Sequence, residues 1–128
     1  VELDELLESS DIVVLHCPLT PETRGLIGKR ELKMMKKSAI LVNVARGPVV
    51  DGKALVEALE NGEIAGALVD VFDKEPPLAL DTPLLSAPNT LLTPHVAFAT
   101  KESMSLRAEI VFDNLRAWME GKQVNTII

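Results

Sequence analysis

Three side chains that can bind or protonate a small anion stand a few residues beyond the end of an apolar run. They are Arg46, Glu75 and His95. At each of these points a buried strand is expected to end and a loop to begin. In open α/β sheets, ligands bind in the crevice beyond the carboxyl ends of the strands. A guanidinium, a carboxylate and an imidazole brought together there indicate acid–base chemistry on a small anion.

Each of these residues also has an ordinary structural interpretation. Arg46 could pair with a surface acid, which would contribute little stability. Glu75 could be a solvated loop carboxylate, and His95 could be a structural histidine. Their joint occurrence at three successive strand ends favours the chemical interpretation.

Composition narrows the class of protein. The 128 residues are 47% hydrophobic, which is enough for the core of one domain. No apolar run approaches the roughly 20 residues that span a bilayer, and no cationic leader is visible. Cys17 is the only cysteine, so an internal disulfide is impossible and a soluble, cytoplasmic protein is expected. The net charge of -6 argues against nucleic-acid and membrane partners, and no spacing indicates a metal site.

Helices and strands are expected to alternate along the chain. Helices are predicted over 4–10, 29–37, 51–60 and 100–120, and strands over 11–16, 39–44, 65–72 and 90–93. Residues 75–89 have no clear period and are interpreted as a long loop. The continuous apolar runs are typical of parallel strands covered on both faces. Apolar residues recur every three or four positions in the last helix, so one of its faces is expected to be buried.

The order of elements predicts an α/β fold with a parallel sheet and right-handed crossovers. None of the seven glycines forms the G-x-G-x-x-G turn of a dinucleotide site, and the chain begins with Val1 rather than Met. Residues 1–128 are therefore interpreted as the C-terminal part of a dinucleotide-binding domain. This part is the second half of a Rossmann-type parallel sheet with flanking helices, lacking the first strands and the glycine-rich loop.

Four segments carry a resemblance to a known family. They are His16-Cys17-Pro18-Leu19-Thr20, Asn43-Val44-Ala45-Arg46-Gly47-Pro48-Val49-Val50-Asp51, Asp70-Val71-Phe72-Asp73-Lys74-Glu75-Pro76 and Thr93-Pro94-His95-Val96-Ala97. In order and content they resemble the D-isomer-specific 2-hydroxyacid dehydrogenases, which include hydroxypyruvate and glyoxylate reductases, phosphoglycerate dehydrogenase and D-lactate dehydrogenase. The resemblance implies a two-domain enzyme with an inserted NAD domain. The helix at 100–120 would return towards a substrate domain.

The resemblance also implies a role for each of the three side chains. Arg46 would bind the substrate carboxylate, since its planar fork can bind a carboxylate bidentately. His95 would be the general acid in reduction and the base in oxidation, because imidazole titrates near neutral pH. Glu75 would accept a hydrogen bond from the other ring nitrogen of His95 and so favour the imidazolium.

Cofactor contacts are implied at further positions. The resemblance assigns them to Cys17, Pro18, Thr23, Val44, Ala45, Arg46, Asp70, His95 and Ala97. Asp70 would bind the nicotinamide carboxamide, and the backbone of Val44 and Ala45 would line the nicotinamide side. Ala97 stands where many members carry glycine. NAD is the expected cofactor, with NADP not excluded, because the position that reads the ribose 2′ group would lie upstream of Val1.

The expected activity is hydride transfer between NAD(H) and a small D-2-hydroxy acid or 2-keto acid, in a homodimer. Two other interpretations stay open. The first is a corepressor-like module that senses NAD, because fold alone does not separate such proteins from enzymes. The second is an inactive structural fragment that self-associates through an exposed edge and apolar face. The identity of the keto acid is left open by the sequence.

Overall fold

The computed structural model describes residues 1–74 and 78–126. The chain divides into two compact units, Val1–His95 and Val96–Ile128. The first unit contains, in chain order, α1 (Leu3–Ser9), β1 (Ile12–Leu15), α2 (Lys29–Met34), β2 (Ile40–Asn43), η1 (Gly47–Val49), α3 (Gly52–Glu60), β3 (Gly66–Val69), η2 (Pro83–Ser86) and β4 (Thr90–Leu92). The second unit contains α4 (Lys101–Met119).

The four strands form one parallel sheet in the order β1-β2-β3-β4. One register row crosses the sheet at the strand ends, through Leu15, Asn43, Val69 and Leu92. The carboxyl ends of all four strands therefore meet at one edge. The predicted α/β class and the alternation of strand and helix are confirmed.

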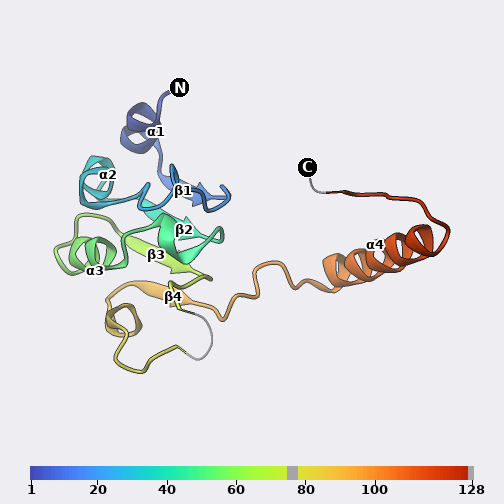
Figure 1. Ribbon diagram of the computed structural model, residues 1–128. Coiled ribbons are helices and arrows are strands. Elements are labelled where there is room, and N and C mark those ends of the chain that lie inside the picture. Colours follow the sequence, from blue (N-terminus) through green and yellow to red (C-terminus); the bar gives the residue numbers. More distant parts are fainter. Residues whose placement is uncertain (75–77, 127–128) are drawn as a thin grey trace. The chain divides into compact units, whose positions relative to one another are not determined.

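One face of the sheet is covered by helices. Figure 1 shows α1, α2 and α3 side by side on the same face. Leu7, Leu32 and Leu55 from these helices are buried against strand residues such as Leu41. Burial of this apolar surface is the main favourable contribution to folding. Leu32 of α2 and Met35, the residue directly after α2, are both buried.

The other face of the sheet is apolar and open. Ile12 is 60% exposed and Leu91 is 58% exposed, and Val14 and Leu68 are exposed beside them. The expectation that the strands are covered on both faces is wrong for the described residues. All three helices of the unit lie on one face, so alternate residues of each strand have no covering layer.

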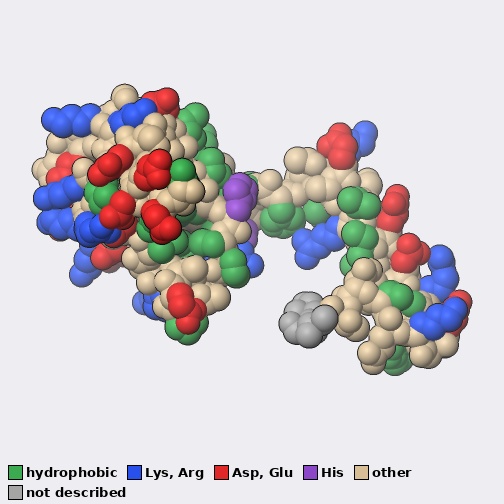
Figure 2. Space-filling model, turned by 90° about the horizontal axis from the view of Figure 1, so that it is seen from above, with side chains coloured by type: hydrophobic (Ala, Val, Ile, Leu, Met, Phe, Trp, Pro, Cys, Tyr) green, Lys and Arg blue, Asp and Glu red, His purple; other side chains and the backbone are tan. Residues whose placement is uncertain are grey.

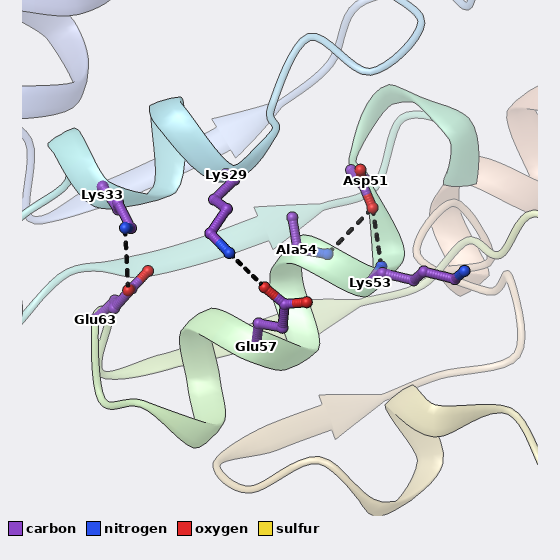
Figure 3. Close-up of polar contacts among 7 residues, drawn as sticks. All are labelled: Lys29, Lys33, Asp51, Lys53, Ala54, Glu57 and Glu63. Carbon is purple, nitrogen blue, oxygen red and sulfur yellow. Dashed lines mark hydrogen bonds and ion pairs between the residues drawn. The ribbon is translucent and has the colours of Figure 1, made fainter.

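Helix α3 begins where its sequence signal predicts. The Asp51 carboxylate accepts hydrogen bonds from the backbone N–H groups of Lys53 (3.0 Å) and Ala54 (3.1 Å), as Figure 3 shows. These bonds satisfy donors that have no partner within the helix. The helix ends before Gly62, which takes a positive φ of 63°.

Ion pairs join the helical layer. Lys29 Nζ lies 2.8 Å from Glu57 Oε2, and Lys33 Nζ lies 4.0 Å from Glu63 Oε1 (Figure 3). The hydrogen bond with Glu57 raises the pKa of Lys29. Exposed pairs of this kind contribute little to stability, so the apolar contacts beneath them hold the layer together.

The second unit is described by itself. Thr100 caps α4, because its hydroxyl oxygen accepts a hydrogen bond from Ser103 N–H at 3.1 Å. The predicted helix is confirmed, but the predicted burial of one face is wrong, since no residue of α4 is buried. Figure 2 shows hydrophobic side chains at the surface of this helix, among charged ones. α4 is the single helix among the described residues of its unit, which therefore offers no second element to cover the apolar stripe.

Candidate functional site

Arg46 lies three residues beyond the end of β2. Its side chain is exposed, and its Nη1 donates a hydrogen bond to the backbone oxygen of Ala45 at 2.6 Å. Ala45 itself is buried. The guanidinium thus lies at the edge of the sheet formed by the carboxyl ends of the strands. It is anchored to the buried Ala45, and its N–H donors can reach an anion.

His95 lies three residues beyond the end of β4. Its φ of 57° is in the left-handed region, which is uncommon for residues other than glycine. Strained backbone of this kind is concentrated at functional sites. The half-buried imidazole lines a cavity of about 320 Å³ together with Phe72 and Leu92. A cavity of this size can hold a small ligand.

Asp70 lies between these two residues, directly after β3. It is 3% exposed, and the Thr93 hydroxyl donates a hydrogen bond to its Oδ1. The Thr93 backbone N–H also bonds the oxygen of Val69 at 3.0 Å. The end of β4 is therefore joined to the end of β3 twice, and the buried carboxylate is held at the same edge as Arg46 and His95.

The topology sets how far apart these groups stand. Arg46, Asp70 and His95 follow β2, β3 and β4, which are consecutive neighbours in the sheet. Neighbouring strands lie about 4.8 Å apart, so the β2 and β4 ends are separated by roughly 10 Å. A molecule with a carboxylate and a carbonyl can reach side chains from both ends.

The loop after β1 reaches the loop after β2. Gly25 N–H donates to Pro48 O at 2.8 Å, and Ile27 N–H donates to Val49 O at 3.1 Å. Within the loop, the Thr23 hydroxyl donates to Pro18 O at 2.7 Å. The predicted cofactor residues Cys17, Pro18 and Thr23 therefore belong to a loop that is bonded to the arginine segment.

Two predicted residues are not placed against this cluster. Glu75 lies outside the described residues, so its pairing with His95 stays a prediction. Ala97 is exposed and belongs to the second unit. Its contact with a cofactor also stays a prediction.

A second cavity, of about 600 Å³, lies around the first turn of α3. Gly47, Val71 and Leu84 contribute to its lining. Among the described residues, neither Arg46 nor His95 borders it. The cavity beside His95 is therefore the better candidate for chemistry.

Two residues at the strand ends were not assigned a role from the sequence. Asn43 and Thr93 are both polar residues at the ends of apolar runs, which was the available signal. Asparagine is depleted in strands, whereas threonine is common in them. Asn43 bonds the backbone two and three residues ahead, and Thr93 bonds Asp70, which is identified as its partner only once β3 and β4 are paired.

Residues 1–74 and 78–126 show neither a metal cluster nor a membrane span. No group of three or more His, Cys, Asp or Glu side chains in this part could hold a metal ion. None of its helices has the length and hydropathy required to cross a membrane.

Comparison with known proteins gives the family. The profile of the D-isomer specific 2-hydroxyacid dehydrogenase NAD binding domain matches residues 1–97. Glycerate dehydrogenase from Methylorubrum extorquens is 47% identical over 131 residues, covering 99% of this chain and 41% of that protein. Glyoxylate reductase from Korarchaeum cryptofilum is 52% identical over 122 residues, covering 95% of this chain and 36% of that protein.

Solved structures agree with the sequence matches. The NAD-complexed D-isomer specific 2-hydroxyacid dehydrogenase from Lactobacillus delbrueckii ssp. bulgaricus superposes with a TM-score of 0.87 and 37% identity, covering 100% of this chain and 43% of that one. The chain thus spans about two fifths of the length of the proteins it matches. Both sequence relatives carry enzyme names, which lends no support to a corepressor-like module. By profile, sequence identity and fold, the chain belongs to the D-isomer specific 2-hydroxyacid dehydrogenase family and corresponds to part of its NAD-binding domain.

Proposed function

We propose that residues 1–128 form the C-terminal part of the NAD-binding domain of an enzyme that interconverts a small D-2-hydroxy acid and its 2-keto acid. The observation that carries this proposal is the placement of Arg46, Asp70 and His95 on three neighbouring strand ends. Relatives named glycerate dehydrogenase and glyoxylate reductase support a substrate of two or three carbons. A cytoplasmic homodimer remains the expected state of the complete enzyme.

The described residues suit the nicotinamide end of a dinucleotide. Asp70 offers a buried carboxylate that accepts a hydrogen bond from Thr93, and such a group can also accept one from a carboxamide. The backbone of Val44 and Ala45 lies beside it at the neighbouring strand end. When bound, NADH supplies a hydride to carbon 2 of the keto acid.

The protein side chains would supply the remaining requirements of the reaction. Arg46 binds the substrate carboxylate with paired N–H donors and fixes the position of carbon 2. His95 donates a proton to the carbonyl oxygen as the alcohol forms, and takes it back in the oxidative direction. Glu75 orients the imidazole through its second nitrogen. The apolar side chains of Phe72 and Leu92 line the cavity beside His95.

A kinetic experiment on the complete enzyme tests this proposal. Oxidation of NADH is followed with glyoxylate, hydroxypyruvate and pyruvate, for the wild type and for His95→Asn. We expect turnover of at least one keto acid by the wild type. In His95→Asn, kcat is expected to fall by about 100-fold or more, with a far smaller change in the Kd for NADH. Absence of keto-acid-dependent oxidation, or unchanged kcat in His95→Asn, would overturn the proposal.

The isolated chain provides a second readout. Without a glycine-rich phosphate loop it is expected not to oxidise NADH at enzymatic rates. The interpretation as a partial domain would be wrong if the purified 128-residue chain turned over glyoxylate as fast as the complete enzyme.

A further inference from the structure

Asn43 is a buried amide at the end of β2. It is 2% exposed, and its side chain lies on the same face of the strand as the buried Leu41. A buried amide costs free energy unless its donor and acceptor are both satisfied. The contacts that satisfy Asn43 therefore indicate what it does.

The oxygen and the nitrogen of the Asn43 side chain each form a hydrogen bond with the backbone around Arg46. Oδ1 accepts a hydrogen bond from Ala45 N–H, and Nδ2 donates one to Arg46 O, each at 3.1 Å. Arg46 O also accepts a hydrogen bond from Val49 N–H at 3.2 Å. The backbone on both sides of the Arg46 α-carbon is thereby fixed relative to the end of the strand.

The same turn is held from the β3 side. Asp70 N–H donates to Asn43 O at 3.0 Å. A Cβ atom at Gly47 would lie 2.2 Å from the carbonyl carbon of Phe72 and 2.5 Å from the backbone nitrogen of Asp73. Only glycine allows this approach, so the arginine turn lies directly against the backbone after β3.

We propose that Asn43 is a positioning residue for the Arg46 guanidinium and thereby sets the affinity of the site for the substrate carboxylate. This inference rests on the proposed function. In this role Asn43 need not contact substrate or cofactor, since it is 2% exposed and both ends of its amide bond the backbone. It acts through the backbone of residues 45 and 46, and the Arg46 side chain is further held by its own bond to Ala45 O.

The chemistry of the amide explains why asparagine is required. The turn presents the Ala45 N–H, which needs an acceptor, and the Arg46 carbonyl, whose second lone pair can accept a bond beside that from Val49 N–H. Asparagine supplies both from one short, planar group. An ionised aspartate of the same shape supplies only acceptors and faces the Arg46 carbonyl with negative charge. A protonated aspartate again supplies one donor and one acceptor.

This difference gives a pH-dependent test in the complete enzyme. For Asn43→Asp at pH 8, we expect the KM for glyoxylate and the dissociation constant for oxamate, a 2-keto acid analogue, to rise at least about tenfold. The Kd for NADH is expected to rise by a clearly smaller factor, because Asn43 also bonds Ala45, whose backbone is proposed to lie beside the nicotinamide. The ratio of variant to wild-type KM should fall towards one at lower pH, as the introduced carboxylate becomes protonated and regains a donor.

Two further variants separate positioning from general destabilisation. Asn43→Ser, which cannot bridge both backbone groups, is expected to raise KM without recovery at low pH. It also serves if Asn43→Asp does not fold. Ile64→Ala truncates a buried side chain that lies just before β3. This position is at the opposite end of the strand from the site. The substitution should lower Tm while leaving KM for glyoxylate unchanged.

The outcomes are distinguishable. If Asn43→Asp and Asn43→Ser bind oxamate as the wild type does, or lose NADH affinity to the same extent as oxamate affinity, the positioning role is wrong. A KM rise in Ile64→Ala equal to that in Asn43→Ser would also overturn it. If the wild type neither binds oxamate nor oxidises NADH, the proposed function fails, and this inference fails with it.

Discussion

Thr93 is bonded to the end of β3 through its hydroxyl group and through its backbone N–H. The hydroxyl donates to a carboxylate that is almost fully buried, and hydrogen bonds to charged groups contribute about 1.5–3 kcal/mol. The orientation of Asp70 is therefore set in part by a residue on the next strand. Thr93 also stands two positions before His95, so one residue links two parts of the site.

Removing the Thr93 hydroxyl should weaken cofactor binding. In the complete enzyme, Thr93→Val keeps the shape of the side chain and removes the donor to Asp70. We expect the Kd for NADH to rise about tenfold, equivalent to about 1.4 kcal/mol, in fluorescence titrations. Thr90→Val is the matched control, because the Thr90 hydroxyl on the same strand bonds Ala87 O instead. Equal effects of the two substitutions would contradict this role.

At the residue scale, the sequence indicated Arg46 and His95 as candidates but gave no role to the residues that support them. Arg46 and His95 could be found because each follows an apolar run that predicts a strand. The role of Thr93 could not, since its partner Asp70 is identified only once the strands are paired. Asn43 bonds residues only two and three positions ahead, but its residue type alone does not distinguish such a turn from other uses of asparagine. The assignments of Arg46, Asp70 and His95 to substrate and cofactor remain proposals.

At the element scale, capping interactions fix where the helices begin. Asp51 starts α3, whose N-terminus follows the η1 segment beyond Arg46. We expect Asp51→Ala to lower the free energy of unfolding by about 1 kcal/mol. Asp51→Asn, which keeps a capping oxygen, should lose no more than a few tenths. Urea unfolding measures both, and an equal loss in both variants would show that capping is not the cause.

The stability that the first turn of α2 contributes to the fold should depend on pH. Burial raises the pKa of Glu31, but hydrogen bonds from Arg30 and from the backbone N–H groups of Glu31 and Gly28 outweigh burial and hold this pKa below its usual 4.5. A lowered folded-state pKa contributes stability that is present above pH 4.5 and lost as pH falls through the folded-state value.

Glu31→Gln tests this dependence. The difference in free energy of unfolding between wild type and variant should be largest above pH 4.5 and should shrink as pH falls below it. Urea unfolding from about pH 3 to about pH 7 measures this difference. The exposed Glu60 provides the control substitution, Glu60→Gln. A difference for Glu31→Gln that grows on acidification would contradict the assignment.

The order and type of the elements could be predicted, whereas their lengths could not. The apolar run at 65–72 predicted a long strand, but β3 covers only Gly66–Val69. Beyond Val69 the chain still contains buried apolar residues such as Val71, which pack without continuing the ladder. An apolar run in the sequence predicts that its residues are buried. Buried residues need not be hydrogen-bonded to a neighbouring strand.

At the scale of the whole molecule, the sheet has one covered and one open face. The chain spans about two fifths of the length of the relatives compared above. The sequence pattern showed that both faces of the strands are apolar. It could not show which face this chain covers itself, because that depends on the side of the sheet on which each connecting helix lies. The burial expected for one face of α4 fails for a different reason, because its unit holds no second helix or strand among the described residues.

The central claim is that Arg46 and His95 act on one small molecule from the ends of β2 and β4, which flank β3 in the sheet. A crystal structure of the complete enzyme with NADH and oxamate tests this claim most directly. We predict hydrogen bonds from the Arg46 guanidinium to the oxamate carboxylate and from the His95 imidazole to its carbonyl oxygen. Oxamate bound away from either side chain, with the enzyme active in the same crystal form, would contradict the claim.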